Sequence, residues 1–425
     1  MKLLIAILIA VSGSIAYAQS LTLDEAIGLA QDKSWNSLIE KQNYEKVLLQ
    51  RRQVLATALP QVSAQASYNN YLNKPQIGGF SLNSTHQVDM GLTVRQKLFE
   101  FGGIGNSLEA AAALLQQSDY QKKQVENYIR HETTIAYYSV LLTERQLKIS
   151  EESLENARNN LRFLRQSFAA GRAPRGDILR LETDIVSRQS TVNMARTELE
   201  SSYLVLKEIL KIAEDAPLKL STPLDEVLPV LEKEALNEVA INENLDLKIL
   251  ESNKDYLQSA SLVERSSMLP KLGLFYNLSR SGRSDEKAFS MEENVNTQVI
   301  GLELTWSLWD GGGNKARYDE RKRDVMVADY SLKRSQDKVL LDLNKAIKEY
   351  ESIRNNLETD RKSLKLAQES FSLVQDLLKV GKTSITELNS TEGLLISIKV
   401  NYIVNLFRAH ERLSLINYLT SARGL

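Results

Sequence analysis

Cysteine is absent from the 425 residues of this chain, which excludes disulfides, iron–sulfur clusters, thiolate zinc sites and a catalytic cysteine. Histidine is scarce: His86, His131 and His410 lie far apart, in no spacing typical of metal ligands. An excess of positive charge is also missing, because 53 basic residues face 54 acidic ones and the net charge is −1. Nucleic-acid binding needs such an excess to replace counterions. We therefore expect no metal, no cofactor and no nucleic-acid partner.

Glycine and proline are also scarce. The chain has 19 glycines and 7 prolines, about half of the roughly 51 that average usage would give. Neither occurs between Gly105 and Gly171 or between Gly313 and Gly381, so segments of 65 and 67 residues contain no helix breaker. At a rise of about 1.5 Å per residue, each segment predicts a helix about 100 Å long, much longer than an ordinary globular helix.

Apolar residues recur every seven positions through these segments and beyond the glycines that end them. The four series are Val140, Leu147, Leu154, Leu161 and Phe168; Ile178, Ile185, Val192, Leu199 and Leu206; Leu343, Tyr350, Leu357, Leu364, Phe371 and Leu378; and Leu388, Leu395, Tyr402, Ala409 and Ile416. A seven-residue period over four or five repeats predicts coiled-coil seams. With turns at Gly171 and Gly381, the pattern predicts two long helical hairpins.

Before each hairpin the apolar period changes to two. Apolar and polar residues alternate over 61–68, 88–95, 271–278 and 300–308. The pattern predicts four strands of roughly 10–12 residues, each apolar on one face. This length and alternation are typical of outer-membrane barrel strands, although a soluble sheet with one buried face gives the same period. Four strands cannot close a membrane barrel alone, since single-chain barrels begin at about eight strands; two chains would supply eight and three would supply twelve.

The chain is an internal duplication with a constant offset. Matching positions 210 residues apart are Leu59-Pro60 and Leu269-Pro270, Gly102-Gly103 and Gly312-Gly313, Gly171 and Gly381, and Asp177-Ile178 and Glu387-Leu388. Shared spacing across strand, junction and turn indicates two copies of one unit.

We predict three parts in the chain. Residues 1–18, with the apolar run Leu3–Val11 and the small residues Ala16-Tyr17-Ala18, are typical of a cleaved signal peptide. Repeat 1 covers 19–229. Repeat 2 covers 230–425. Within the repeats we expect β-hairpins at about 61–99 and 270–309, helical hairpins at about 105–212 and 314–420, and a proline-marked linker at about 213–229.

The order of these features resembles the TolC-like outer-membrane efflux factor family. The segments that carry the resemblance are Leu21–Ala26, Leu59–Val62, Gln96–Gly103, Phe168–Gly171 and Val380–Thr383 with Glu387-Leu388. The resemblance implies a mainly α fold with β, in which a two-fold internal repeat gives two barrel strands and a coiled-coil hairpin per copy. Three chains would form a trimeric 12-stranded β-barrel in the cell outer membrane, in contact with its lipid, and an α-helical barrel in the periplasm.

The resemblance implies a passive export duct of a tripartite efflux pump, docked on a periplasmic adaptor (membrane fusion) protein and an inner-membrane transporter. One alternative is a channel for type I protein secretion, and another is metal efflux. A secreted coiled-coil adhesin is a different class, and it leaves the four strands unexplained. An enzyme is not expected, because no phosphate loop and no nucleophile–His–acid set occurs in a recognisable spacing.

The resemblance also places function at the two hairpin turns. Residues expected to contact the adaptor are Gly171, Arg172, Arg175, Gly381, Lys382 and Thr383. Glycine at each turn is also compatible with a helix C-cap and nothing more.

The gate of the tunnel is expected at Glu387, with Asp177 at the matching position of repeat 1. Three Glu387 carboxylates around an axis would form a negative constriction. Alternatively, Ser384 to Glu387 is a capping box that starts a helix, and both roles are compatible. A basic brace of the closed tip would have to use Lys382, Arg172 or Arg175 against Asp177 or Glu387.

Overall fold

The computed structural model describes residues 19–73, 76–77, 80–81, 85–224, 227–291 and 293–421. The predicted signal peptide lies outside these residues. The chain divides into two compact units. We call the first the tip unit; it contains residues up to Glu40, Lys123–Asn244 and Asp337 onward. The second, the sheet unit, contains Lys41–Lys122 and Leu245–Gln336. Each unit takes segments from both sequence repeats.

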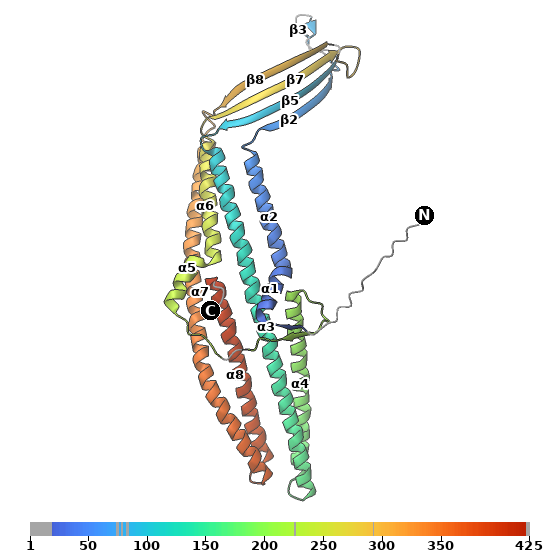
Figure 1. Ribbon diagram of the computed structural model, residues 1–425, viewed down its shortest axis with the longest axis vertical. Coiled ribbons are helices and arrows are strands. Elements are labelled where there is room, and N and C mark those ends of the chain that lie inside the picture. The colour runs from blue at the N-terminus through green and yellow to red at the C-terminus, as the bar shows by residue number, and fades with distance from the viewer. Residues whose placement is uncertain are drawn as a thin grey trace, which may run out of the picture. The chain divides into compact units, whose positions relative to one another are not determined.

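Helices make up most of the chain, as the scarcity of glycine and proline predicts (Figure 1). In chain order they are α1 (Leu23–Lys33), α2 (Trp35–Ala56), α3 (Gly103–Ala169), α4 (Arg175–Leu210), α5 (Lys233–Glu243), α6 (Leu245–Ser266), α7 (Gly313–Lys379) and α8 (Ile385–Thr420). Helices α3 and α7 have 67 residues each, which confirms the two long helices. Among the described residues, no helix combines the length and the apolar character needed to cross a membrane.

The sheet unit holds the four predicted strands in one antiparallel sheet (Figure 1). They are β2 (Gln61–Asn70), β5 (His86–Phe99), β7 (Lys271–Ser284) and β8 (Glu293–Thr305), in the order β2-β5-β7-β8. The two repeats therefore join through the β5–β7 pair. Three strands are longer than predicted, at 13 or 14 residues. A two-residue hairpin that the sequence did not indicate, β3 (Gln76–Ile77) with β4 (Phe80–Ser81), lies between β2 and β5.

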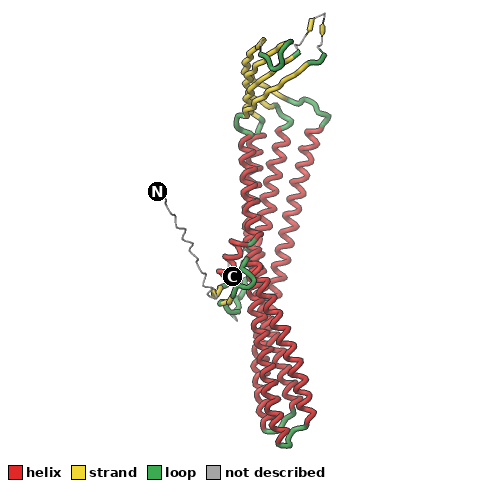
Figure 2. Tube along the Cα trace, turned by 90° about the vertical axis from the view of Figure 1, so that its right-hand side faces the viewer, coloured by secondary structure: helices red, strands yellow, loops and turns green. Residues whose placement is uncertain are grey.

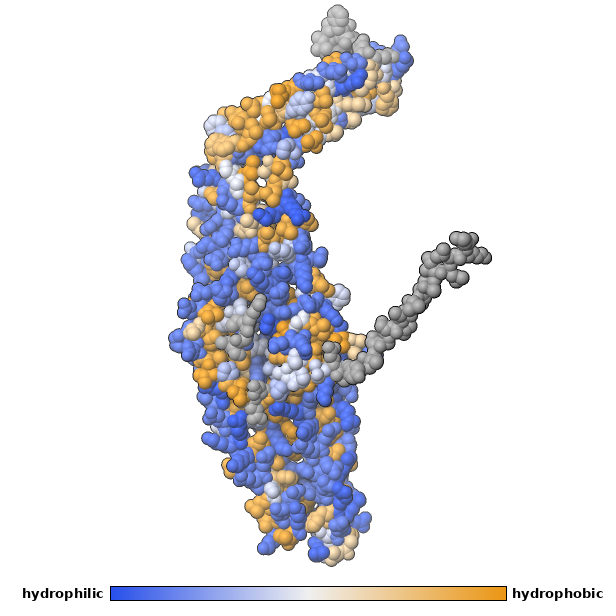
Figure 3. All heavy atoms as spheres, in the orientation of Figure 1, coloured by the Kyte–Doolittle hydropathy of each residue, from blue (hydrophilic) through white to orange (hydrophobic). Residues whose placement is uncertain are grey.

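The register gives the sheet one apolar and one polar face. One apolar row crosses all four strands through Val62, Val94, Tyr276 and Ile300. The adjacent row on the other face reads Ser63, Thr93 and Asn277, and it ends in Val299 on β8. Apolar residues gather over the sheet in Figure 3, and Ile300 is 72% exposed. Within the described residues, much of the apolar face is thus exposed, including Val62 and Ile300, although Val88 is buried.

The tip unit confirms the coiled-coil seams. Heptad residues with at most 7% exposure are Val140, Leu154, Val192, Leu206, Leu343, Tyr350, Leu357, Leu388, Leu395, Tyr402, Ala409 and Ile416. Phe168, which the seam also included, is 43% exposed because it lies two residues before the turn. Figures 1 and 2 show the α3–α4 and α7–α8 hairpins lying side by side in this unit.

A short parallel pair of strands joins the start of repeat 1 to the segment that follows α4. Strand β1 (Gln19–Leu21) pairs with β6 (Leu218–Leu220), which lies inside the segment predicted as a linker. The buried Tyr137 hydroxyl secures both segments. It donates to the Leu21 carbonyl (2.8 Å) and accepts from the Thr222 N–H (2.9 Å). This pairing carries no signal in the sequence, because strands of three residues have no measurable period.

Candidate functional site

The first hairpin turn is a Schellman motif. Gly171 has φ +72°, and its N–H donates to the Phe168 carbonyl (2.8 Å). The next N–H, that of Arg172, donates to the Ser167 carbonyl (2.8 Å). These two bonds satisfy carbonyls that the end of α3 would otherwise leave unpaired. The left-handed backbone explains the glycine, since a Cβ is strained there.

The second turn repeats the first. Gly381 also has φ +72°, its N–H donates to Leu378 (3.0 Å), and the Lys382 N–H donates to Leu377 (2.9 Å). A Cβ added at Gly171 or Gly381 would meet no atom within 4 Å. The C-cap interpretation of both glycines is confirmed. Their contact with an adaptor stays a prediction.

The two predicted gate acids occupy the same place in successive helices. Asp177 is the third residue of α4 and Glu387 the third residue of α8. The Ser384 hydroxyl accepts from the Glu387 N–H (3.2 Å). In this described segment, the return bond, in which the Ser384 N–H would donate to the Glu387 carboxylate, is absent, so only half of the predicted capping box forms. Helix α4 starts at Pro174 without a side-chain cap. Glu387 is exposed, and its carboxylate is available for another role.

The predicted brace does not form within one chain. In the described part of the chain, no ion pair joins Arg172, Arg175 or Lys382 to either gate acid. The hairpins touch instead through a contact that the sequence analysis missed: Arg180 Nη1 donates to Thr386 Oγ1 (2.9 Å). The basic residues at the tips are therefore exposed around the turns.

Beneath the turns, both hairpins share one apolar core. Its buried members are Ala157, Leu164, Leu181, Ile385 and Leu388, from α3, α4 and α8. Phe371, Val374 and Leu378 of α7 pack against it. A hollow of about 400 Å³ opens between the two turns. Its lining includes Arg172, Gly381 and Thr383, which are predicted adaptor contacts, the predicted gate acid Asp177, and Ser384 of the predicted capping box. The structure thus brings the tips of both repeats together.

A buried ion pair lies just above this core, and the sequence analysis missed it. Glu392 of α8 is 1% exposed, and its Oε2 lies 2.7 Å from Arg188 Nη1 of α4. Asn156 of α3 donates to Glu392 Oε1 (3.1 Å). Burial raises the pKa of Glu392, while Arg188 and Asn156 act to lower it. A signal was present: Glu392 falls between Leu388 and Leu395, on the apolar seam of α8.

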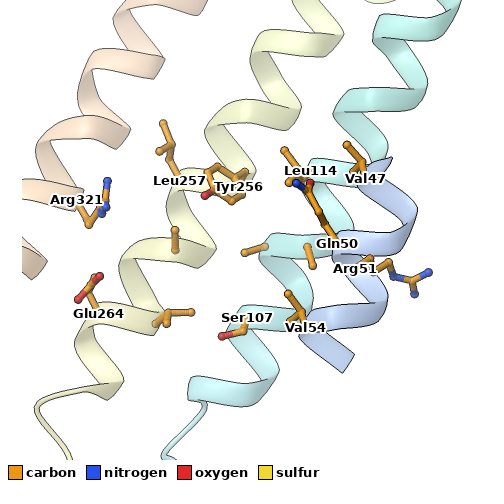
Figure 4. Close-up of a pocket in the computed structure, with 14 residues that line it drawn as sticks. Val47, Gln50, Arg51, Val54, Ser107, Leu114, Tyr256, Leu257, Glu264 and Arg321 are labelled. Carbon is orange, nitrogen blue, oxygen red and sulfur yellow. The ribbon is translucent and has the colours of Figure 1, made fainter. Parts of the chain in front are cut away.

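A second cavity, of about 430 Å³, lies in the sheet unit between α2, α3, α6 and α7. Figure 4 shows Val47 of α2 near Leu114 of α3 and Val54 near Ser107, with Tyr256 and Leu257 on α6. The walls are mostly apolar, and none of the predicted site residues lines it. Among the described residues, no group of three His, Asp or Glu side chains could hold a metal ion.

Comparison with known proteins gives a family match. A sequence profile described as "Outer membrane efflux protein" matches residues 41–210 and 236–403. The chain is 24% identical over 264 residues to the alkaline protease secretion protein AprF of Pseudomonas aeruginosa, covering 61% of this chain and 53% of AprF. The matched part thus spans about half the length of that relative. The pyoverdine export outer membrane protein OpmQ of the same organism is 20% identical over 375 residues, 84% of this chain and 78% of OpmQ.

The fold matches solved structures over nearly its whole length. The outer-membrane channel OprN superimposes with a TM-score of 0.80 at 18% identity, covering 94% of this chain and 89% of OprN. At this identity the likeness shows the fold alone. It agrees with the mainly α architecture and four-stranded sheet described above.

Proposed function

This chain belongs to the family of outer membrane efflux proteins, and from that premise we propose that it forms the outer-membrane export duct of a tripartite efflux pump. As a family member it is an outer-membrane protein. Its proposed partners are two further copies of itself, outer-membrane lipid, a periplasmic adaptor and an inner-membrane transporter. The transporter supplies the energy, and the duct performs no chemical reaction. Similarity to AprF, which is named for protease secretion, favours type I protein secretion as the alternative.

The observation that carries the proposal is the open sheet with an uncovered apolar face. An unpaired strand edge in lipid costs several kcal/mol for each unsatisfied backbone group. Within the described residues, β2 and β8 are the outer strands and pair on one side only. Joining β8 of one copy to β2 of the next removes both edges. Three copies then close twelve strands, with the polar row facing the interior and the apolar row facing lipid.

Exposed heptad stripes on α4 and α7 support the same assembly. On α4 the stripe is Leu179, Val186 and Met194; on α7 it is Leu366 and Leu373, and Val380 follows one residue beyond the end of the helix. Val186 is 70% exposed and Leu373 61% exposed. Helix α4 leaves the tip while α7 approaches it. Leu179 and Leu373 each lie eight residues from their turn glycine, and Val186 and Leu366 each lie fifteen, so these two pairs match in height in antiparallel order. Packing α4 of one copy against α7 of the next covers both stripes and, if repeated, closes a ring.

Deleting the gene in its own host tests the proposed function. We expect slower efflux of small toxic solutes and greater susceptibility to them, restored by the gene on a plasmid. Secreted proteins should be unchanged in the medium. Loss of secreted proteins with normal efflux would instead support the secretion channel. If neither changes, the export proposal is wrong.

Glu387→Gln tests the proposed gate. Three carboxylates a few ångströms apart repel by about 1 kcal/mol per pair or more in a partly wet site, so the ring should attract cations. Gln should reduce cation selectivity and block by multivalent cations in planar bilayers. The substitution should not disturb the start of α8, because the Ser384 hydroxyl accepts from the main-chain N–H of residue 387, which Gln retains. Asp376→Asn is a matched control, since that exposed carboxylate already pairs with Lys379 (2.8 Å). If Glu387→Gln keeps the parental cation selectivity, Glu387 only helps to start α8 and does not form the gate.

A further inference from the structure

The apolar face of the four-stranded sheet carries one formal charge. Leu92 and Leu278 pair in one of its apolar rows. In the next row, farther from the helices, Arg280 of β7 lies between Met90 of β5 and Asn296 of β8. No other Asp, Glu, Lys or Arg lies on this face of the described strands β2, β5, β7 and β8. The charge is therefore placed at the edge of the apolar rows.

Beyond Arg280, the chain itself covers the same face. Tyr68 and Gly282 belong to the next row. The segment between β7 and β8 folds onto this row, where the ring of Phe289 stacks on Tyr68 with 4.2 Å between the ring centroids. A Cβ added at Gly282 would collide with the side chain of Met291, so this segment also lies close against β7. The exposed apolar rows therefore end at Arg280.

The length of β7 places Arg280 at the boundary of a hydrocarbon layer. Leu272 begins the apolar rows at the helix end of this strand, eight residues before Arg280. Eight residues span about 27 Å, which is a height of about 21 Å in a strand tilted by about 40°. The apolar band of a membrane barrel is about 25 Å tall, and a long arginine side chain extends beyond its own Cα toward water. This step rests on the proposed function, in which the helix end faces the periplasm, so Arg280 lies among the headgroups of the outer leaflet.

The Arg280 guanidinium is available to a ligand. Its side chain is exposed, and in the described part of the chain it takes part in no ion pair or hydrogen bond. Asn296, its partner in the register of β8, is exposed as well, and side chains paired in this way lie about 5 Å apart. A guanidinium donates two parallel hydrogen bonds to a phosphate, and an amide can donate another. Met90, on the other side, is 49% exposed and offers an apolar surface next to the charge.

We propose that Arg280 and Asn296 bind the phosphate of a phosphorylated glycolipid in the outer leaflet, whose acyl chains lie on the apolar rows between Arg280 and the helix end. Such a lipid pairs the charge and covers the exposed apolar rows at the same time, whereas a free phosphate ion does only the first. Near the interface an unpaired arginine on the lipid face costs up to about 1 kcal/mol, and the phosphate removes this cost. The site consists of residues of one chain, so it exists whether or not the copies assemble.

Native mass spectrometry in mild detergent, with added lipid, counts the lipids bound per chain. The probe is lipid A with two phosphates, and the same lipid without phosphate is the comparison. We expect the parental protein to prefer the phosphorylated lipid. Arg280→Gln should weaken its binding about tenfold, which is the loss of one charge-assisted contact. Arg283→Gln is the matched control, because it removes an exposed arginine from the opposite face of the same strand; lipid binding should be unchanged.

Arg280→Lys keeps the charge but loses the paired donors, so an intermediate fall of about threefold in lipid affinity is expected. Parental affinity in folded Arg280→Gln overturns the lipid site. Equal binding of the lipid without phosphate, or displacement of lipid A by inorganic phosphate at the same concentration, overturns it as well. Lipid binding that depends on Arg280, in a protein that is a single chain in every detergent, supports the lipid site and counts against the trimeric duct.

Discussion

Replacing Val186 and Leu373 by Asp in the same chain is expected to abolish the trimer. Both side chains are exposed in one chain and lie in the stripes that we place between neighbouring copies. A carboxylate buried there without a partner costs about 3 kcal/mol or more per interface, equivalent to more than a hundredfold in affinity. The ring has three such interfaces, so this loss of binding free energy occurs at each of them. Native mass spectrometry of the detergent-solubilised variant should give mainly single chains.

Ser187→Asp with Ser372→Asp is the matched control. It adds the same charges one residue away, about 100° around each helix, at exposed positions outside the stripes. This control should keep three copies together. If the Val186 and Leu373 variant is as trimeric as the control, α4 and α7 do not meet between copies.

Gly381→Leu is expected to preserve the trimer and impair export. The residue adopts φ +72° and an added Cβ meets no neighbouring atom, so the cost is about 1–2 kcal/mol of backbone strain. That cost falls on the turn that we propose as an adaptor contact, and the leucine would project from it. Drug susceptibility of the host should rise while trimer yield stays near the parental value.

Two comparisons separate the strain from the contact. Gly381→Ala has nearly the same backbone cost but little bulk, so it should export better than Gly381→Leu. Gly171→Leu makes the same change in the first turn and should impair export in the same direction. Parental susceptibility in Gly381→Leu, at parental trimer yield, would show that this turn is not a contact site.

Sequence reasoning was most reliable where one residue type controls local structure. Missing glycine and proline predicted the two 67-residue helices, and the seven-residue period predicted which face is buried. The 210-residue offset placed Gly171 and Gly381 in equivalent turns, which the structure confirms as the same motif. In each case the property is local to the chain, so spacing is sufficient.

Features that depend on distant segments were not predicted. The β1–β6 pair joins residues almost 200 positions apart, and its strands are too short for a pattern. The position of Glu392 on the apolar seam was visible, but its partner Arg188 belongs to the other hairpin. The exposed stripes on α4 and α7 also follow from spacing, yet only the structure shows that no described side chain covers them.

The candidate site was predicted in part. Residues of both turns lie together around one hollow at the tips; Asp177 lines this hollow, and Glu387 does not. The expected basic brace is absent within one chain, because Arg172, Arg175 and Lys382 lie exposed on the turns and have no acidic partner there. Their partners must therefore come from another chain or from solvent. A single chain lacks the neighbour that a ring would provide.

The most direct test of the account is native mass spectrometry of the wild-type protein, extracted from outer membranes in several mild detergents. A duct built from this chain requires more than one copy, since one chain supplies only four strands to the sheet, and the duct that we propose has three. We predict a single assembly with three times the mass of the processed chain. Folded protein that is a single chain in every detergent would contradict the trimeric duct.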